Sequence, residues 1–155
     1  MSIKLQLSQI LEEKTGEFGD NAAYLGRLCK AQYLCSVLAD QTEEPGRRKE
    51  LILAAVETGA KALEKDNMNP EVHKWYAIAL GSRGEFSGVK EKILDGFEFK
   101  KHIDTAARLA PRDYVTHHLL GRFCYEVSQV SFLGNYHRRT RTPIYSFQDH
   151  FNGQN

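Results

Sequence analysis

The side chains with the most chemical potential in this sequence are its six histidines. Four of them fall inside helical patterns, at His73, His102, His117 and His118. A zinc site needs three or four ligands that converge with defined spacing, whereas two adjacent residues of a helix point about 100° apart. No Cys-x-x-Cys or His-Glu-x-x-His motif supports these histidines. We therefore expect surface or hydrogen-bonded histidines, no metal, no cofactor and no enzymatic activity; an enzymatic site would require the histidines to converge in the fold.

The cysteines offer no better nucleophile, because each lies within an apolar helical stripe. They are Cys29, Cys35 and Cys124. An odd number of cysteines in such positions fits reduced thiols in the cytosol better than a disulfide framework. Buried thiols are also unreactive. The cysteines therefore predict a cytoplasmic protein.

Basic side chains could bind an acidic partner. The net charge of +1 argues against a surface built for nucleic acid or anionic membrane, so any such site is local. In the structural interpretation, the basic residues form a solvated helix surface balanced by nearby acids. In the functional interpretation, they attract an acidic partner such as the acidic tails of tubulin over a long range, and salt would screen this attraction. The candidate residues for binding such a partner are Lys90, Lys92, Lys100, Lys101, Arg122, Arg138, Arg139 and Arg141.

The elements that position these residues are helices. At 155 residues and 41% hydrophobic content, one soluble domain is the default. No apolar run approaches the roughly 18 residues of a membrane span, and the first residues lack a secretory signal. Apolar periodicity predicts about six helices, near residues 3–13, 21–39, 47–66, 71–82, 89–109 and 112–130.

Two prolines indicate a repeat. Pro70 and Pro111 stand 41 residues apart, and each opens a new helical pattern. Spacings in this range are typical of stacked helix pairs, since one pair cannot bury its apolar face alone. We therefore predict an all-α fold for residues 1–133, a TPR-like solenoid of antiparallel helix pairs.

A shared Leu-Gly-Arg-x-Cys pattern at residues 25–29 and 120–124 supports the repeat. A glycine inside a helix costs up to about 1 kcal/mol relative to alanine, so we expect another helix to approach Gly26 closely. Trp75 could anchor a partner, but its i, i+4 relation to Ala79 favours the core. The predicted structural core includes Gly26, Trp75, Phe97, Leu120, Gly121 and Cys124.

Residues 134–155 differ in character and show no helical stripe. We expect a poorly ordered C-terminal tail, whose apolar residues, Phe147 and Phe151 among them, could cover an exposed end of the stack. An end left uncovered would expose apolar surface through which two copies could form a homodimer.

Five strings carry a resemblance to a known family. They are residues 27–31 (Arg-Leu-Cys-Lys-Ala), 73–77 (His-Lys-Trp-Tyr-Ala), 84–93, 96–104 and 120–128. Together they resemble the regulator of microtubule dynamics family, whose members have a TPR-like helical domain. The resemblance implies a non-enzymatic protein at microtubules and spindle poles. Some relatives are membrane-anchored, sit at mitochondria or organelle contacts, and have a TPR-like domain implicated in lipid binding.

We expect two departures from that family: no upstream anchor or coiled coil of the kind that some relatives carry, and, after Leu133, no continuation into the family's last helix pair. The leading hypothesis is a helical-repeat scaffold that binds microtubules or microtubule- and spindle-associated proteins. The alternative is a phospholipid-binding or transfer domain at organelle contact sites. A groove in a solenoid can take a peptide or an acyl chain, and the sequence leaves both open.

Overall fold

The computed structural model describes residues 10, 13–40 and 45–140. Within these residues the chain forms helices joined by short turns and contains no strand, which confirms the predicted all-α class. None of the described helices is both long enough and apolar enough to cross a membrane. The elements are α2 (Thr15–Phe18), α3 (Ala22–Asp40), α4 (Pro45–Lys65), α5 (Pro70–Arg83), the 3-10 helix η1 (Gly84–Phe86), α6 (Val89–Leu109) and α7 (Tyr114–Thr140).

Helices α3 to α6 lie within two residues of their predicted bounds at both ends. Helix α7 differs, because it continues to Thr140 rather than ending near residue 130, and the change of character at Gly134 does not interrupt it. The helix predicted at 3–13 lies almost wholly outside the described residues. So do residues 141–155, with Phe147 and Phe151.

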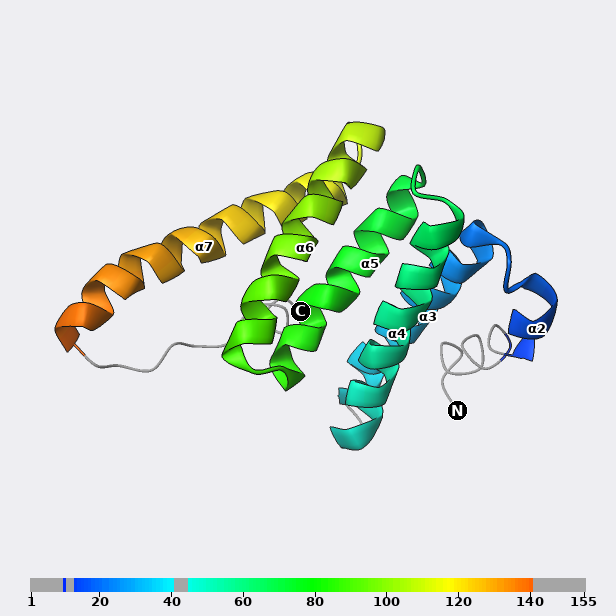
Figure 1. Ribbon diagram of the computed structural model, residues 1–155, viewed down its shortest axis with the longest axis horizontal. Helices are drawn as coiled ribbons and strands as arrows, with labels where there is room; N and C mark the ends of the chain where they lie inside the picture. The colour runs from blue at the N-terminus through cyan, green and yellow to red at the C-terminus, as the bar shows by residue number, and fades with distance from the viewer. Residues whose placement is uncertain (1–9, 11–12, 41–44, 141–155) are drawn as a thin grey trace.

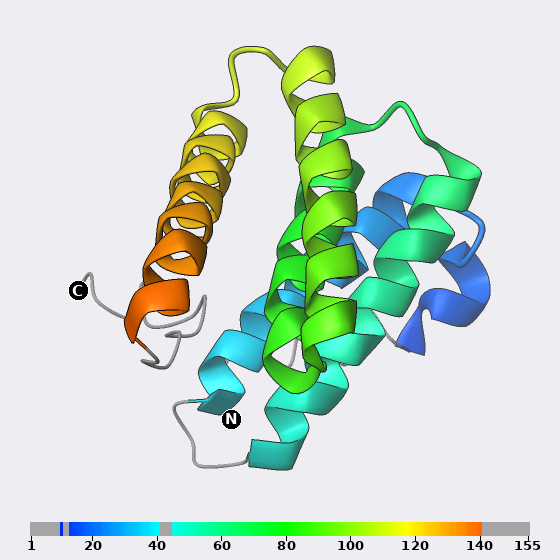
Figure 2. The same cartoon turned by 60° about the vertical axis from the view of Figure 1, so that its left-hand side comes forward.

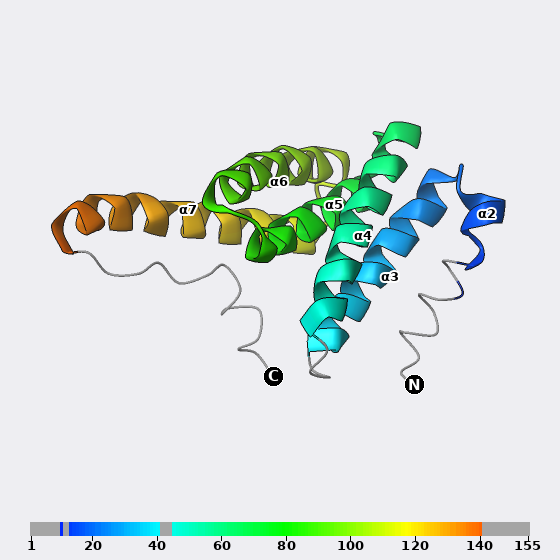
Figure 3. The same cartoon turned by 60° about the horizontal axis from the view of Figure 1, so that its bottom comes forward.

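Helices α3, α4, α5 and α6 run side by side with alternating direction (Figures 1 and 3). This arrangement is compatible with a TPR-like stack of helix pairs. Helix α7 starts beside the end of α6 and then diverges from it (Figures 1 and 2). Among its described side chains, Leu119 in the first half joins the core, where it packs with Phe99 and Ile103 of α6 and Ala77 of α5.

Two glycines let three helices approach closely. A Cβ atom on Gly26 of α3 would lie 2.8 Å from Val72 Cγ2 of α5, which confirms the expected close approach. A Cβ atom on Gly59 of α4 would lie 2.8 Å from Tyr76 Cδ2 of α5 and 3.2 Å from Cys29 Sγ of α3. Side chains at these two positions would force the helices apart.

Ion pairs join successive helices at the edge of this core. Arg83 Nη2 of α5 lies 2.5 Å from Asp95 Oδ1 of α6. Lys74 Nζ of α5 lies 2.7 Å from Oδ2 of Asp113, which also accepts from Thr116 Oγ1 at the start of α7. Because the Lys74 and Asp95 side chains are nearly fully buried, these pairs fix helix positions more firmly than surface pairs would.

The predicted core is partly wrong in its second half. Gly26 is buried, and Trp75 and Leu120 pack against core clusters as partly buried residues. Phe97 is 69% exposed, and Gly121 and Cys124 are also exposed. Gly26 is buried because α4 and α5 both cover α3. Phe97, Gly121 and Cys124 are exposed because α7 meets its described neighbours along one side and then turns away from α6.

Candidate functional site

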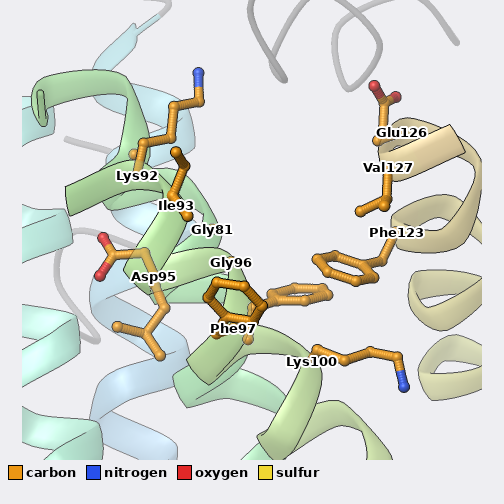
Figure 4. Close-up of a pocket in the computed structure, with 13 residues that line it drawn as sticks. Gly81, Lys92, Ile93, Asp95, Gly96, Phe97, Lys100, Phe123, Glu126 and Val127 are labelled. Atoms are coloured by element: carbon orange, nitrogen blue, oxygen red, sulfur yellow. The ribbon is translucent and has the colours of Figure 1, made fainter. Parts of the chain in front are cut away.

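The main candidate site is an apolar groove between α6 and α7, at the point where these helices diverge (Figure 4). Its volume is about 530 Å³. Ile93 and Phe97 line the α6 side, and Phe123 and Val127 line the α7 side. At its base Phe99 stacks on Phe123 with ring centroids 5.4 Å apart. The groove can therefore hold an apolar molecule or the apolar face of a helix.

Charged groups stand at the rim of this groove, and most of them already have partners. Asp95 is held by Arg83. Lys100 Nζ lies 2.5 Å from Asp104 Oδ2, and Glu126 lies 3.5 Å from Arg122. Lys92 is exposed, and it forms no ion pair within the part of the chain that the structure describes. The groove thus offers an apolar interior with an available ammonium group at its edge.

The structure does not gather the predicted basic residues into one surface. Lys90 and Lys92 are exposed together in the first turn of α6. Lys100 and Lys101 are paired with acids of α6 itself, and Arg122 is paired within α7. Arg138 and Arg139 lie on the last turn of α7, where no side chain is described, and Arg141 is outside the described residues.

A second hollow, which sequence analysis missed, lies between α3 and α5. It measures about 300 Å³, and its lining includes Arg27 and Lys30 of α3 and Trp75 of α5. The spacing of Arg27 and Lys30, i and i+3 on one helix face, is a signal that the sequence does carry. What the sequence hides is that Trp75, far along the chain, lies beside them.

Two of the four histidines do converge, as a buried pair between α5 and α6. His73 Nε2 lies 2.8 Å from the carbonyl oxygen of Asn67 and must donate to it. If both rings are neutral, His73 Nδ1 accepts from His102 Nδ1 across 2.8 Å, and the unprotonated His102 Nε2 lies 3.5 Å from Glu98 Oε2. Burial is the main reason that the pKa of His102 falls to about 4; His73 and Lys101 contribute in the same direction, and Glu98 opposes them.

This histidine pair packs between α5 and α6, with ring centroids 5.0 Å apart. Tyr76 meets the His102 ring edge-on at 4.8 Å, while His117 and His118 are exposed on α7. Among the described residues no three histidine, cysteine or acidic side chains could together hold a metal ion. The thiols of Cys29 and Cys35 are buried, and burial raises the pKa of Cys29 to about 12, which suppresses its thiolate.

Comparison with known proteins decides the family. The family model described as Regulator of microtubule dynamics protein 1-3 matches residues 2–140. The chain belongs to this family. The match covers every helix described above, so the groove between α6 and α7 lies within the shared region.

Individual relatives agree with this assignment. Regulator of microtubule dynamics protein 3 of Bos taurus is 40% identical over 126 residues, which cover 81% of this chain and 26% of that protein. Regulator of microtubule dynamics protein 1 of Bos taurus is 34% identical over 127 residues, or 82% of this chain and 38% of that protein. Protein 2 of Rattus norvegicus is 33% identical over 130 residues, 84% of this chain and 31% of that protein. The chain thus spans between a quarter and two fifths of the length of these relatives.

Proposed function

We propose that this chain is a non-enzymatic helical scaffold that binds microtubules, or proteins associated with microtubules and spindles, in the cytoplasm. The observation that carries the proposal is the family match over residues 2–140 to proteins named regulators of microtubule dynamics. The described histidine pair and the buried thiols are consistent with it, because both are engaged in packing between helices. Stacked helices with open grooves are suited to holding a partner protein.

Electrostatic attraction is the first contribution to such binding. Lys90 and Lys92 are exposed at the start of α6, and neither forms an ion pair within the described residues. Acidic tubulin tails would be attracted by cations of this kind over roughly a Debye length, which is about 10 Å at 0.1 M salt. Binding that depends on this attraction must weaken as salt rises.

Co-sedimentation with polymerised tubulin over a series of salt concentrations tests the proposal. The expected result is that the chain pellets with microtubules at low salt and is released progressively as salt is added. A chain that stays in the supernatant even at the lowest salt would remove the microtubule claim.

The groove between α6 and α7 favours one second candidate, binding of a phospholipid through its acyl chain. Its walls are apolar at Ile93, Phe97 and Val127, and Lys92 at the rim could meet a phosphate group. Native mass spectrometry of the purified chain should then show bound phospholipid, which Phe97→Gln should reduce. Met68→Gln is the matched control, since Met68 is 66% exposed and does not line the groove. A lipid-free spectrum would count against this function. A mass of two chains that Phe97→Gln abolishes and Met68→Gln does not would indicate a homodimer through the groove.

A further inference from the structure

The hollow between α3 and α5 combines positive charge with an aromatic wall, and we call it the Arg27–Trp75 pocket. Its lining comes from the middle of α3 and the first turns of α5: Ala23, Gly26, Arg27, Lys30, Asn69, Glu71, Val72 and Trp75. It lies on different helices from the groove between α6 and α7.

The two cations of this pocket are available to a ligand. Arg27 and Lys30 are both exposed, and neither forms an ion pair within the described residues. The Lys30 ammonium lies 4.9 Å from the centroid of the Trp75 ring. This cation–π contact orients the ammonium group, and its N–H donors can still bind an anion.

The one carboxylate in the lining is already engaged. Glu71 Oε2 accepts a hydrogen bond of 3.1 Å from Trp75 Nε1. Glu71 Oε1 accepts from Lys74 Nζ, which also compensates its charge. Glu71 therefore holds the indole in place and does not neutralise Arg27 or Lys30.

The walls of the pocket are held in fixed positions. Trp75 packs on the core cluster of α3, α4 and α5, and its ring lies 6.0 Å from that of Tyr33. Helix α5 sits directly against α3 at Gly26. Asn69 caps α5 by accepting from two backbone N–H groups, so the positive end of this helix also lies at the pocket. A ligand that binds here pays little for ordering the protein.

We propose that the Arg27–Trp75 pocket binds an acidic segment of a partner protein in an extended conformation. Residues three apart on a helix have Cβ atoms about 5–6 Å apart, and alternate side chains of an extended peptide share one face at about 6.6–6.8 Å. Two glutamates separated by one residue therefore match the pocket: one carboxylate accepts two hydrogen bonds from the Arg27 guanidinium, and the other accepts from Lys30. The inference rests on the proposed protein-binding function and names the chemistry of the partner.

The test uses the full chain and fluorescein-labelled hexaglutamate, with binding followed by fluorescence anisotropy at low ionic strength. Arg27→Gln combined with Lys30→Gln should weaken binding about tenfold or more, because both charged hydrogen-bond donors are lost. Lys49→Gln combined with Arg112→Gln is the matched control. Lys49 and Arg112 are exposed, lie outside the pocket and carry the same total charge, so this variant should bind within about twofold of the original chain.

Equal weakening in both double variants, or no binding by the original chain, would overturn the proposal. Binding of inorganic phosphate in place of hexaglutamate would also overturn it, and would assign the pocket to a phosphate group. Co-sedimentation of the same variants separates this inference from the proposed function. If the pocket variant no longer binds hexaglutamate but the original chain never pellets with microtubules, the pocket proposal is supported and the microtubule role is contradicted. If the pocket variant still binds hexaglutamate as well as the original chain does, and the original chain pellets with microtubules, the pocket proposal is wrong and the microtubule role is retained.

Discussion

The two Leu-Gly-Arg-x-Cys motifs give a sharp test of the packing, because their glycines should respond in opposite directions to alanine. At Gly26 the new Cβ atom would lie 2.8 Å from Val72 Cγ2, well inside the optimal carbon–carbon separation of about 3.5–4.0 Å. Val72 is buried, and its β-branched side chain is confined to one rotamer in a helix. Overpacking of this kind costs about 1–3 kcal/mol. Since the better helix propensity of alanine offsets up to about 1 kcal/mol of this cost, we expect Gly26→Ala to destabilise the fold by up to about 2 kcal/mol.

At Gly121 the new Cβ atom would meet nothing within 4 Å, on the exposed side of α7. Only the helix propensity then changes, so Gly121→Ala should stabilise the fold by about 0.5–1 kcal/mol. Chemical denaturation with urea measures both variants, and thermal melting should show shifts of opposite sign, about 2–4 °C per kcal/mol for a chain of this size.

A third variant identifies the cause. In a chain that already carries Val72→Ala, the Gly26→Ala change should cost nothing, because the atom it strikes has been removed. The resulting coupling energy should be about 1–3 kcal/mol. If Gly26→Ala stabilises the chain as much as Gly121→Ala, or if its cost persists when Val72 is alanine, then α3 and α5 do not approach as described.

Three further predictions concern other parts of the molecule. Folding lowers the pKa of His102 from about 6.5 to about 4, so the unfolded chain binds the proton more tightly than the folded chain. The free energy of unfolding should therefore fall by about 2–3 kcal/mol as the pH drops from about 6.5 to about 4. Urea denaturation at a series of pH values should show a smaller fall for His102→Gln. Lys74→Met should destabilise the fold by about 1–3 kcal/mol, because it removes the charged partner of Asp113, which is 19% exposed and keeps its hydrogen bond from Thr116. Removal of the exposed Lys61 should cost at most about 0.5 kcal/mol. Similar losses in the two denaturation curves would contradict this. Phe99→Ala should lower the free energy of unfolding by about 3–5 kcal/mol and Phe97→Ala by less than about 1 kcal/mol, since Phe99 is buried and Phe97 is 69% exposed. Equal losses would show that Phe97 is a core residue after all.

Local patterns predicted the helices well because their causes are local. The apolar period marks each helix, and Asn69 with Pro70 sets the start of α5 through a side-chain cap and a preset backbone angle. The close approach at Gly26 could also be predicted, since an interior glycine in a helix needs a compensating contact.

The errors arose where the answer depends on which neighbour covers a helix. The motif of Gly26 recurs at Gly121, yet the first is buried under α5 and the second faces outward. Nothing within residues 120–124 distinguishes these two environments. The same limit applies to Phe97, whose exposure follows from the divergence of α7 from α6.

Long-range contacts were the other feature out of reach. His73 and His102 are 29 residues apart and meet through their Nδ1 atoms. Arg27 and Trp75 come together only because α5 packs against α3. No spacing rule links such residues, so both the histidine pair and the Arg27–Trp75 pocket required the folded structure.

The most direct test of the proposed role compares binding of the chain to microtubules with and without their acidic tails, at one low salt concentration. A scaffold that is attracted by those tails should bind intact microtubules and bind tailless ones about tenfold more weakly. Equal binding to both kinds of microtubule would contradict recognition of the acidic tails, and binding to neither would contradict the microtubule role itself.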